Sequence, residues 1–233
     1  MRIDSSYFFD LTNFPHASLF SDIDFPWNAL QKLDSYLQTV PLGVHEGEIS
    51  PQAYLIHPEL ISIGEGSCVE PGAYIQGPCV IGKYCTIRHG AYIRGQVLTG
   101  DYCVIGHDTE VKTAIFLNHV HAAHFAYVGD SILGHYVNLG AGTKCANFRL
   151  DQGTIHVHYE QQRFATQQRK LGALIGDYSQ IGCNTVLNPG TLIGPYVKSY
   201  PCLNIGGFVP AHSVVKPRDP PLIITKNKTN ETI

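Results

Sequence analysis

An apolar residue recurs at every sixth position over most of this chain, and this period limits the folds that the chain can adopt. The residues that stand four places after the members of this series are mostly small. The series is Ile63, Val69, Ile75, Ile81, Ile87, Ile93, Thr99, Ile105, Val111 and Leu117, then Tyr127, Leu133, Leu139 and Cys145, and again from Ile175 onward. A period of six fits neither an α-helix nor a single strand, whose side chains repeat about every 3.6 and 2 residues.

We therefore predict an all-β fold, a parallel β-helix of hexapeptide repeats with three flat sides and one short strand on each side. The aliphatic residue of each repeat points into a narrow core, and the small residue stands where space is tight. Glycine often follows the aliphatic residue, as in Ile63-Gly64, and allows the backbone to turn a corner. About twenty repeats, with three in each coil, predict roughly seven coils. Cys79, Cys85 and Cys103 occupy small core positions and are not expected to bind a metal.

Two interruptions of the repeat are the expected places for a site, because loops on a rigid scaffold often carry function. The first, residues 118–126, contains Asn118, His119, His121 and His124. The second, residues 146–174, contains an alternating stretch at 154–159 that predicts a hairpin strand. It also carries three cations, Arg163, Arg169 and Lys170.

The two ends of the chain lack the repeat. Within residues 1–50, the stretch Pro26–Leu37 predicts a short amphipathic helix with Leu30, Leu33 and Leu37 on one face. We expect this segment to cap the open end of the coil stack and block edge pairing. The predicted organisation is thus an N-terminal cap (1–50), a β-helix (51–216) and a C-terminal tail (217–233).

Composition excludes some classes of function. A net charge of −3 and a pI near 6.4 argue against a broad nucleic-acid surface. No apolar run approaches the roughly 18–20 residues that a membrane helix needs. No secretory signal follows Met1, so a reducing cytoplasm is the expected location.

Two motifs give the sequence a family resemblance. They are His124-Phe125-Ala126-Tyr127-Val128-Gly129-Asp130 and Val137-Asn138-Leu139-Gly140-Ala141-Gly142-Thr143. Residues 60–215 resemble the acetyltransferase half of the bifunctional UDP-N-acetylglucosamine pyrophosphorylase/glucosamine-1-phosphate N-acetyltransferase family. The stretches 144–149 and 169–173 are similar to its sugar-phosphate nucleotidyltransferase-like branch. The resemblance implies a left-handed coil, a homotrimer with sites between subunits, acetyl-CoA as cosubstrate and no required metal.

The resemblance also implies roles for individual residues. His124 matches the general base that takes a proton from the attacking amine, and Arg94 and Lys112 match the residues that hold a sugar phosphate. Tyr127, Asn138 and Asn147 match sugar-contacting positions, and Lys170 is the best match for a second phosphate lysine. Ala141 matches a backbone N–H donor to the thioester oxygen, and Cys183 stands where the family has a small polar residue near the acyl-CoA.

Spacing supports one of these assignments independently. Arg94 and Lys112 each follow an aliphatic core position and lie one full coil of 18 residues apart. We therefore expect both to stack on the same face. A guanidinium fork and an ammonium group suit a phosphate ligand.

The predicted function is acetyl-CoA-dependent N-acetylation of an amino-sugar phosphate such as glucosamine 1-phosphate, in UDP-N-acetylglucosamine and cell-envelope precursor synthesis. Nothing in residues 1–60 resembles the family's L-x-x-G-x-G-T-R nucleotide-binding motif. Pyrophosphorylase activity is therefore not expected from this chain, and a separate nucleotidyltransferase is a candidate partner.

Three alternatives stay open. The acceptor of an acyltransferase can be another phosphorylated or nucleotide-linked sugar. His119, His121 and His124 can provide a zinc site, since some hexapeptide proteins resemble carbonic anhydrases and bind zinc through histidines of adjacent subunits. The chain can also be a non-enzymatic trimeric scaffold.

Overall fold

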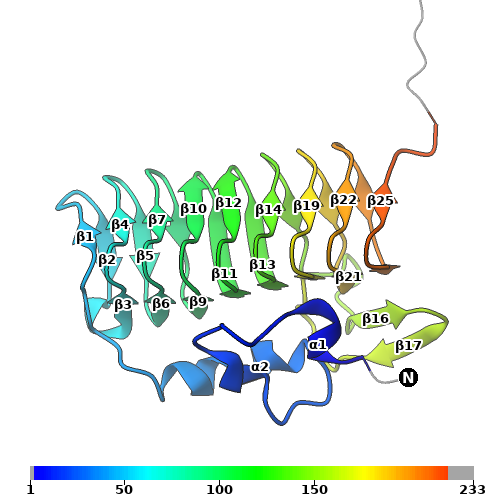
Figure 1. The fold of residues 1–233 in the computed structure, drawn as a ribbon, viewed down its shortest axis with the longest axis horizontal. Coiled ribbons are helices and arrows are strands. Elements are labelled where there is room, and N and C mark those ends of the chain that lie inside the picture. The colour runs from blue at the N-terminus through cyan, green and yellow to red at the C-terminus, as the bar shows by residue number, and fades with distance from the viewer. Residues whose placement is uncertain (1–2, 220–233) are drawn as a thin grey trace, which may run out of the picture.

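The computed structural model describes residues 3–219 and confirms the predicted parallel β-helix (Figure 1). Short strands stack into three flat sides, which we call faces 1, 2 and 3 in the order in which the chain passes through each coil. All pairs between neighbouring coils are parallel. Residues 220–233 of the predicted tail lie outside the described residues.

Each face is a ladder of strands from successive coils. Face 1 contains β1 (Glu48–Ile49), β4 (Cys68–Val69), β7 (Thr86–Ile87), β10 (Val104–His107), β12 (His121–His124), β14 (Asn138–Leu139), β19 (Gln180–Ile181), β22 (Lys198–Ser199) and β25 (Val214–Val215). Face 2 contains β2 (Tyr54–Ile56), β5 (Tyr74–Gln76), β8 (Tyr92–Ile93), β15 (Lys144–Cys145), β20 (Val186–Leu187) and β23 (Asn204–Ile205). Face 3 contains β3 (Ile61–Ile63), β6 (Cys79–Ile81), β9 (Val97–Thr99), β18 (Ala173–Ile175), β21 (Thr191–Ile193) and β24 (Phe208–Val209). Two long strands, β11 (Glu110–Phe116) and β13 (Tyr127–Leu133), run from face 2 into face 3.

The nine strands of face 1 correspond to nine coils, so the prediction of about seven was too low. The first coil, β1 to β3, ends at Ile63 and lies where the hexapeptide period is not yet clear. Its inward side chains Ile49 and Leu55 are only partly buried against the core. From Ile61 to Ile205 the aliphatic and small positions form one core, with Ile75, Ile87 and Ile93 fully buried.

The insertion predicted at residues 118–126 is not present. This stretch forms a regular coil that includes β12, in which Ala122 is a core residue. The coils here are one residue short instead, since Val104 pairs with His121 and His121 with Asn138 at a separation of 17. The missing residue is at the corner between faces 2 and 3. There, two residues separate the core positions Val111 and Ala114, whereas three separate Ile93 and Val97. Leu117 therefore points outward and Tyr127 is not a core residue.

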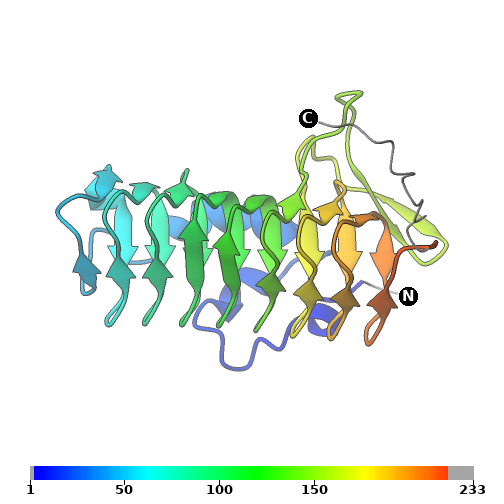
Figure 2. The same cartoon turned by 90° about the horizontal axis from the view of Figure 1, so that it is seen from above.

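The second insertion contains the predicted hairpin, formed by β16 (His156–Tyr159) and β17 (Gln162–Ala165). It projects from the side of the stack, as the view from above shows (Figure 2). The Asn147 carbonyl accepts a hydrogen bond from the Leu171 backbone N–H at 3.0 Å. Phe148 and Lys170 form a backbone bridge beside it, so the insertion has a narrow neck.

The N-terminal segment does not cap an end of the stack, so that prediction was wrong. It contains α1 (Ser5–Phe8), η1 (Ala17–Phe20) and α2 (Asn28–Leu37), while η2 (Pro58–Leu60) lies between β2 and β3. The segment lies along face 3 (Figure 1), where Leu33 and Leu37 of α2 belong to the same buried cluster as Leu98 and Ile132. The outer side of face 3 is therefore a second apolar core.

A ladder of stacked rings follows the corner between faces 3 and 1. Neighbouring centroids are 4.4–5.0 Å apart. Its members are Tyr84, Tyr102, His119, Tyr136, Tyr178, Tyr196 and His212. Every member has a positive φ, a conformation that costs a non-glycine residue energy. Stacking between coils offsets part of that cost.

Candidate functional site

The candidate site lies at the corner between faces 2 and 3, where the regular coil is most disturbed. Two short corners, at Thr113 and Asp130, follow one another here, and both residues have positive φ, 46° and 48°. The insertion leaves the same corner on the next coil, between β15 and β18. Irregular backbone from three successive coils therefore surrounds one place on the surface.

A cavity of about 420 Å³ opens at this corner. It brings together five of the six residues that were predicted to bind substrate, and it adds Phe148. Its lining is Arg94, Lys112, Tyr127, Asn147, Phe148 and Lys170. The register of β8 and β11 places Arg94 and Lys112 on adjacent coils of face 2, as their spacing of 18 residues predicts.

Both cations of face 2 have carboxylate partners. The Arg94 guanidinium is 2.6 Å from Glu110, and this hydrogen bond raises the pKa of Arg94. The Lys112 ammonium is 2.8 Å from the Asp130 carboxylate, and the two side chains are only 16% and 11% exposed. Burial makes the second pair the stronger contact, because water screens it less.

Tyr127, Asn147 and Lys170 complete the lining. Partial burial raises the pKa of Tyr127, while a side-chain hydrogen bond with Asn147 opposes that shift. The amide of Asn147 also donates to Asp130 at 2.5 Å. Lys170 is exposed at the neck of the insertion. The cavity therefore contains three cations. Two carboxylates, Glu110 and Asp130, lie next to it.

His124 lies outside this cavity, at the end of β12 and at the corner between faces 1 and 2. Its carbonyl accepts a hydrogen bond from the Gly142 backbone N–H at 3.0 Å. Its imidazole is exposed. In this coil face 2 begins with Tyr127 of β13. His124 lies at one edge of face 2 and the cavity at the other.

The remaining predicted residues lie near His124 rather than in the cavity. Asn138 of β14 pairs with His121 on face 1. Ala141 and Cys183 occupy the same corner as His124 on the next two coils, where the Ala141 carbonyl accepts from Asn184 N–H at 2.8 Å. Cys183 is exposed. The predicted residues thus form two groups on either side of face 2.

The histidines of the zinc alternative are not assembled within one chain. The His119 ring is stacked between Tyr102 and Tyr136 at the corner between faces 3 and 1. His124 lies at the other edge of face 1. Across residues 3–219 no group of three or more His, Cys, Asp or Glu side chains is arranged to hold a metal ion.

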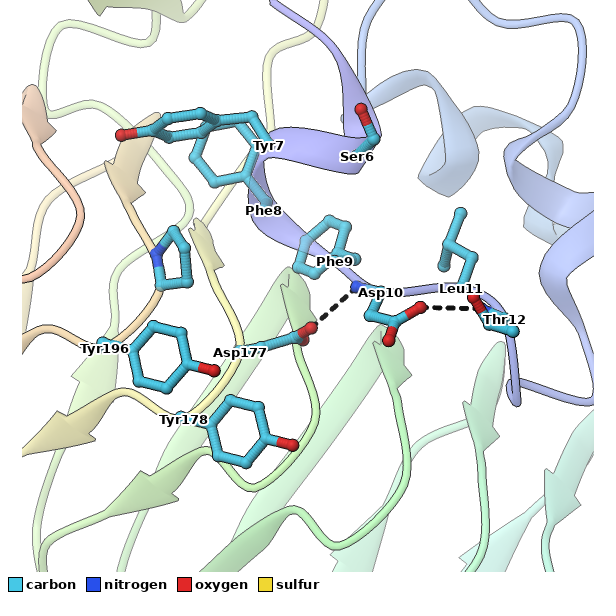
Figure 3. A pocket seen from close by; sticks show the side chains of 11 residues that line it. Ser6, Tyr7, Phe8, Phe9, Asp10, Leu11, Thr12, Asp177, Tyr178 and Tyr196 are labelled. Carbon is cyan, nitrogen blue, oxygen red and sulfur yellow. Dashed lines mark hydrogen bonds between the residues drawn. The ribbon is translucent and has the colours of Figure 1, made fainter.

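A hollow of about 530 Å³ lies elsewhere, between the N-terminal segment and the ring ladder (Figure 3). Phe9, Asp10 and Asp177 line it together with Tyr178 and Tyr196, and it contains none of the predicted site residues. Its walls belong to the contact that attaches the N-terminal segment.

Sequence reasoning missed three residues at the site. Glu110 stands two positions before Lys112, and Phe148 directly follows Asn147. Asp130 ends the first of the two recognised motifs, yet it was given no role. Its position in that motif was the available signal.

Comparison with known proteins agrees with the resemblance. Residues 75–161 match the family model described as the GMPPB C-terminal domain. A bifunctional sugar-1-phosphate nucleotidylyltransferase/acetyltransferase of Sulfurisphaera tokodaii is 34% identical over 184 residues, which cover 77% of this chain and 44% of that protein. The bifunctional protein GlmU of Methanocaldococcus jannaschii is 36% identical over 86 residues, 37% of this chain and 21% of that protein. This chain thus spans less than half of either relative.

YaiX of Escherichia coli K12, described as an uncharacterized acetyltransferase, is 32% identical over 168 residues, which cover 71% of this chain and 72% of YaiX. Among solved structures, the acetyltransferase domain of PglB from Neisseria gonorrhoeae aligns over 79% of this chain and 59% of that chain. Its sequence identity is 15% and its TM-score 0.35, so it adds no argument to the fold described above. On the strength of its sequence relatives, the chain belongs to the hexapeptide-repeat acetyltransferase family that includes YaiX and the acetyltransferase part of the GlmU-like bifunctional proteins.

Proposed function

We propose that this protein is an acetyl-CoA-dependent N-acetyltransferase whose acceptor is a phosphorylated amino sugar of the glucosamine 1-phosphate type. The observation that carries the proposal is the cavity in which Arg94, Lys112 and Lys170 converge beside Tyr127 and Asn147. Three cations with five, three and three N–H donors suit a phosphate group. The two neighbouring carboxylates leave an excess of one positive charge, which favours a small anionic ligand.

The reaction divides between the two groups of residues. The cavity holds the phosphate of the acceptor and thereby directs its amine across face 2. His124 takes the proton of that amine as the nitrogen attacks the thioester carbonyl. A C–N bond forms and the C–S bond breaks, and the departing CoA thiolate takes up a proton. The N–H of Ala141 donates to the carbonyl oxygen as negative charge develops on it.

Two further parts of the proposal concern partners. The protein acts as a homotrimer, as the family resemblance implies, and the apolar side chains exposed around the site in the single chain support a contact between copies. Leu150 is completely exposed at the insertion and Phe125 half-exposed beside His124, and a second copy would cover them. The N-acetylated sugar phosphate would then pass to a nucleotidyltransferase, the activity that is joined to an acetyltransferase in the name of the Sulfurisphaera relative.

The test is release of free thiol from acetyl-CoA in the presence of glucosamine 1-phosphate. His124→Ala should lower the rate by a factor on the order of 10²–10⁴. His121→Ala is the matched control, since His121 is an exposed histidine of the same strand and should leave the rate nearly unchanged. Folded protein without turnover would rule out this acceptor, and assays with nucleotide-linked amino sugars would follow. Equal rates in the His124→Ala variant and the wild type would remove His124 as the base.

A further inference from the structure

Asp130 connects three separate parts of the candidate site. Its Oδ2 accepts from Lys112 Nζ at 2.8 Å and from Asn147 Nδ2 at 2.5 Å. Its backbone carbonyl accepts from Gly172 N–H at 2.7 Å, at the point where the insertion returns to the coil. One residue therefore fixes a cation of face 2, an amide at the start of the insertion and the backbone at its end.

The short corner puts Asp130 in a position to make these contacts. Because one residue is missing between Val128 and Ser131, Asp130 takes a positive φ of 48° at the turn into face 3. This conformation costs an aspartate less than most side chains. The residue is 8% exposed, so its carboxylate needs its two donors to offset the loss of water.

The contacts of Asp130 also determine which atoms are left for a ligand. One N–H of Asn147 is bound to Asp130, and the Asn147 amide also forms a hydrogen bond with the Tyr127 phenol that opposes the rise in the pKa of Tyr127 caused by burial. Asp130, Asn147 and Tyr127 therefore form one connected network. A Cβ on Gly129 would lie 2.6 Å from Asn147 Nδ2 and 2.7 Å from Tyr127 Oη, so this network requires a residue without a side chain at position 129.

We infer that Asp130 is a positioning residue of the acceptor site, which holds the Lys112 ammonium and the Asn147 amide in place for the phosphate of the acceptor. The inference rests on the proposed function and names a residue that acts through others. Asp130 also has an effect that opposes binding. Its carboxylate repels a phosphate, and its removal would release the full charge of Lys112 and tighten binding if this effect dominated. The sign of the change in binding decides between the two.

Asp130→Asn is the first variant, because it removes the charge and nearly keeps the shape. We expect the Kd and KM for glucosamine 1-phosphate to rise on the order of tenfold, as for loss of a charge-assisted hydrogen bond. The Kd for acetyl-CoA should stay within about twofold. Unchanged or tighter sugar-phosphate binding would overturn the inference. So would equal weakening for both substrates, which indicates a general loss of structure. Asp151→Asn, an exposed carboxylate of the insertion paired with Arg149, should match the wild type.

Asp130→Glu separates position from charge. It keeps the carboxylate and moves it by one methylene group, so repulsion of a phosphate is nearly unchanged. A raised Kd for glucosamine 1-phosphate supports positioning, whereas a Kd equal to that of the wild type contradicts it. This variant also provides the test if Asp130→Asn does not fold.

Chemical labelling of Lys112 tests the contact without any substrate. With trace acetic anhydride and peptide mass spectrometry, Lys112 of the wild type should react slowly and Lys170 serves as the exposed internal reference. In Asp130→Asn, Lys112 should react on the order of tenfold faster, and equal rates would overturn the inference. Faster labelling together with no binding of glucosamine 1-phosphate to wild-type protein would refute the proposed acceptor and leave the positioning of Lys112 supported.

Discussion

The backbone N–H of His135 donates to Oδ1 of Asp177 at 2.7 Å, and this contact joins two neighbouring coils at the place where the N-terminal segment attaches to the β-helix. The other oxygen of Asp177 accepts from Asp10 N–H, also at 2.7 Å (Figure 3). The His135 ring adds two contacts, with the Asp10 carbonyl at 2.8 Å and the Asn118 N–H at 3.0 Å. Since one ring nitrogen meets a carbonyl and the other an N–H, this arrangement requires neutral His135.

Asp177→Ala should destabilise the protein by about 2 kcal/mol or more, because it leaves two backbone N–H groups without an acceptor. The free energy of unfolding in urea measures this loss. Asp10→Ala is the matched control, because Asp10 uses its backbone N–H toward Asp177 and its side chain only toward Thr12. Its cost should stay within about 0.5 kcal/mol, as at other surface positions. Equal costs for the two variants would contradict the role given to the Asp177 carboxylate.

Asp177 should also make stability depend on pH. Burial raises the pKa of Asp177 above its ordinary value of 3.8, and the neighbouring Asp10 carboxylate adds to the rise. The folded state therefore binds this proton more readily than the unfolded chain. The contribution of Asp177 to stability is greatest below the unfolded pKa and is lost as pH rises through the folded pKa. As the pH rises above about 4, the unfolding free energy of the wild type should therefore fall relative to that of Asp177→Asn. A difference that moves the other way would show that hydrogen bonds, rather than burial, dominate.

The hexapeptide period was sufficient to predict the inner core but not the outer one. Ile75, Ile87 and Ile93 alternate with residues that are partly or fully exposed, so their direction is clear. In the stretch Ala114-Ile115-Phe116-Leu117 every residue is buried, because one side faces the core and the other the N-terminal segment. A strand that is apolar on both sides shows no period, and the loss of one residue near Thr113 was therefore misinterpreted as an insertion at residues 118–126. The amphipathic pattern of α2 likewise predicts an apolar face without identifying its partner.

The same reasoning explains which site residues could be predicted. Arg94 and Lys112 lie on two regular coils, so a spacing of 18 residues placed them side by side. Lys170 follows a long insertion, and only the structure shows that its neck returns Lys170 to Asn147. The motif marks Asp130, but its partners could not be predicted, because they are 18 and 17 residues away at a corner whose shortening was not recognised.

Thiol labelling should separate the seven cysteines by burial. Cys183 and Cys202 are exposed, Cys68 is partly buried and the other four are buried. Burial raises the pKa of Cys145 to about 12 and that of Cys79 further, so little thiolate is available at either. With Ellman's reagent at neutral pH, we expect two fast thiols, one slower and four that react only in denaturant. Rapid reaction of a buried thiol in the native protein would show that the coil opens locally.

Trp27 links the N-terminal segment to the insertion, and its truncation should affect both. Its side chain is 1% exposed, stacks on Phe25 at 4.6 Å and lies 6.5 Å from the Phe164 ring of β17. Trp27→Ala should cost about 3–5 kcal/mol, and hydrogen exchange should show faster opening of α2 than of faces 1 and 2. Because β17 leads directly to Lys170, we also expect the KM for the sugar phosphate to rise while that for acetyl-CoA stays unchanged. Trp27→Phe retains an aromatic ring and should cause a smaller loss of stability and a smaller rise in the KM for the sugar phosphate. A variant that loses stability without any change in either KM would show that the hairpin keeps its place independently of the N-terminal segment.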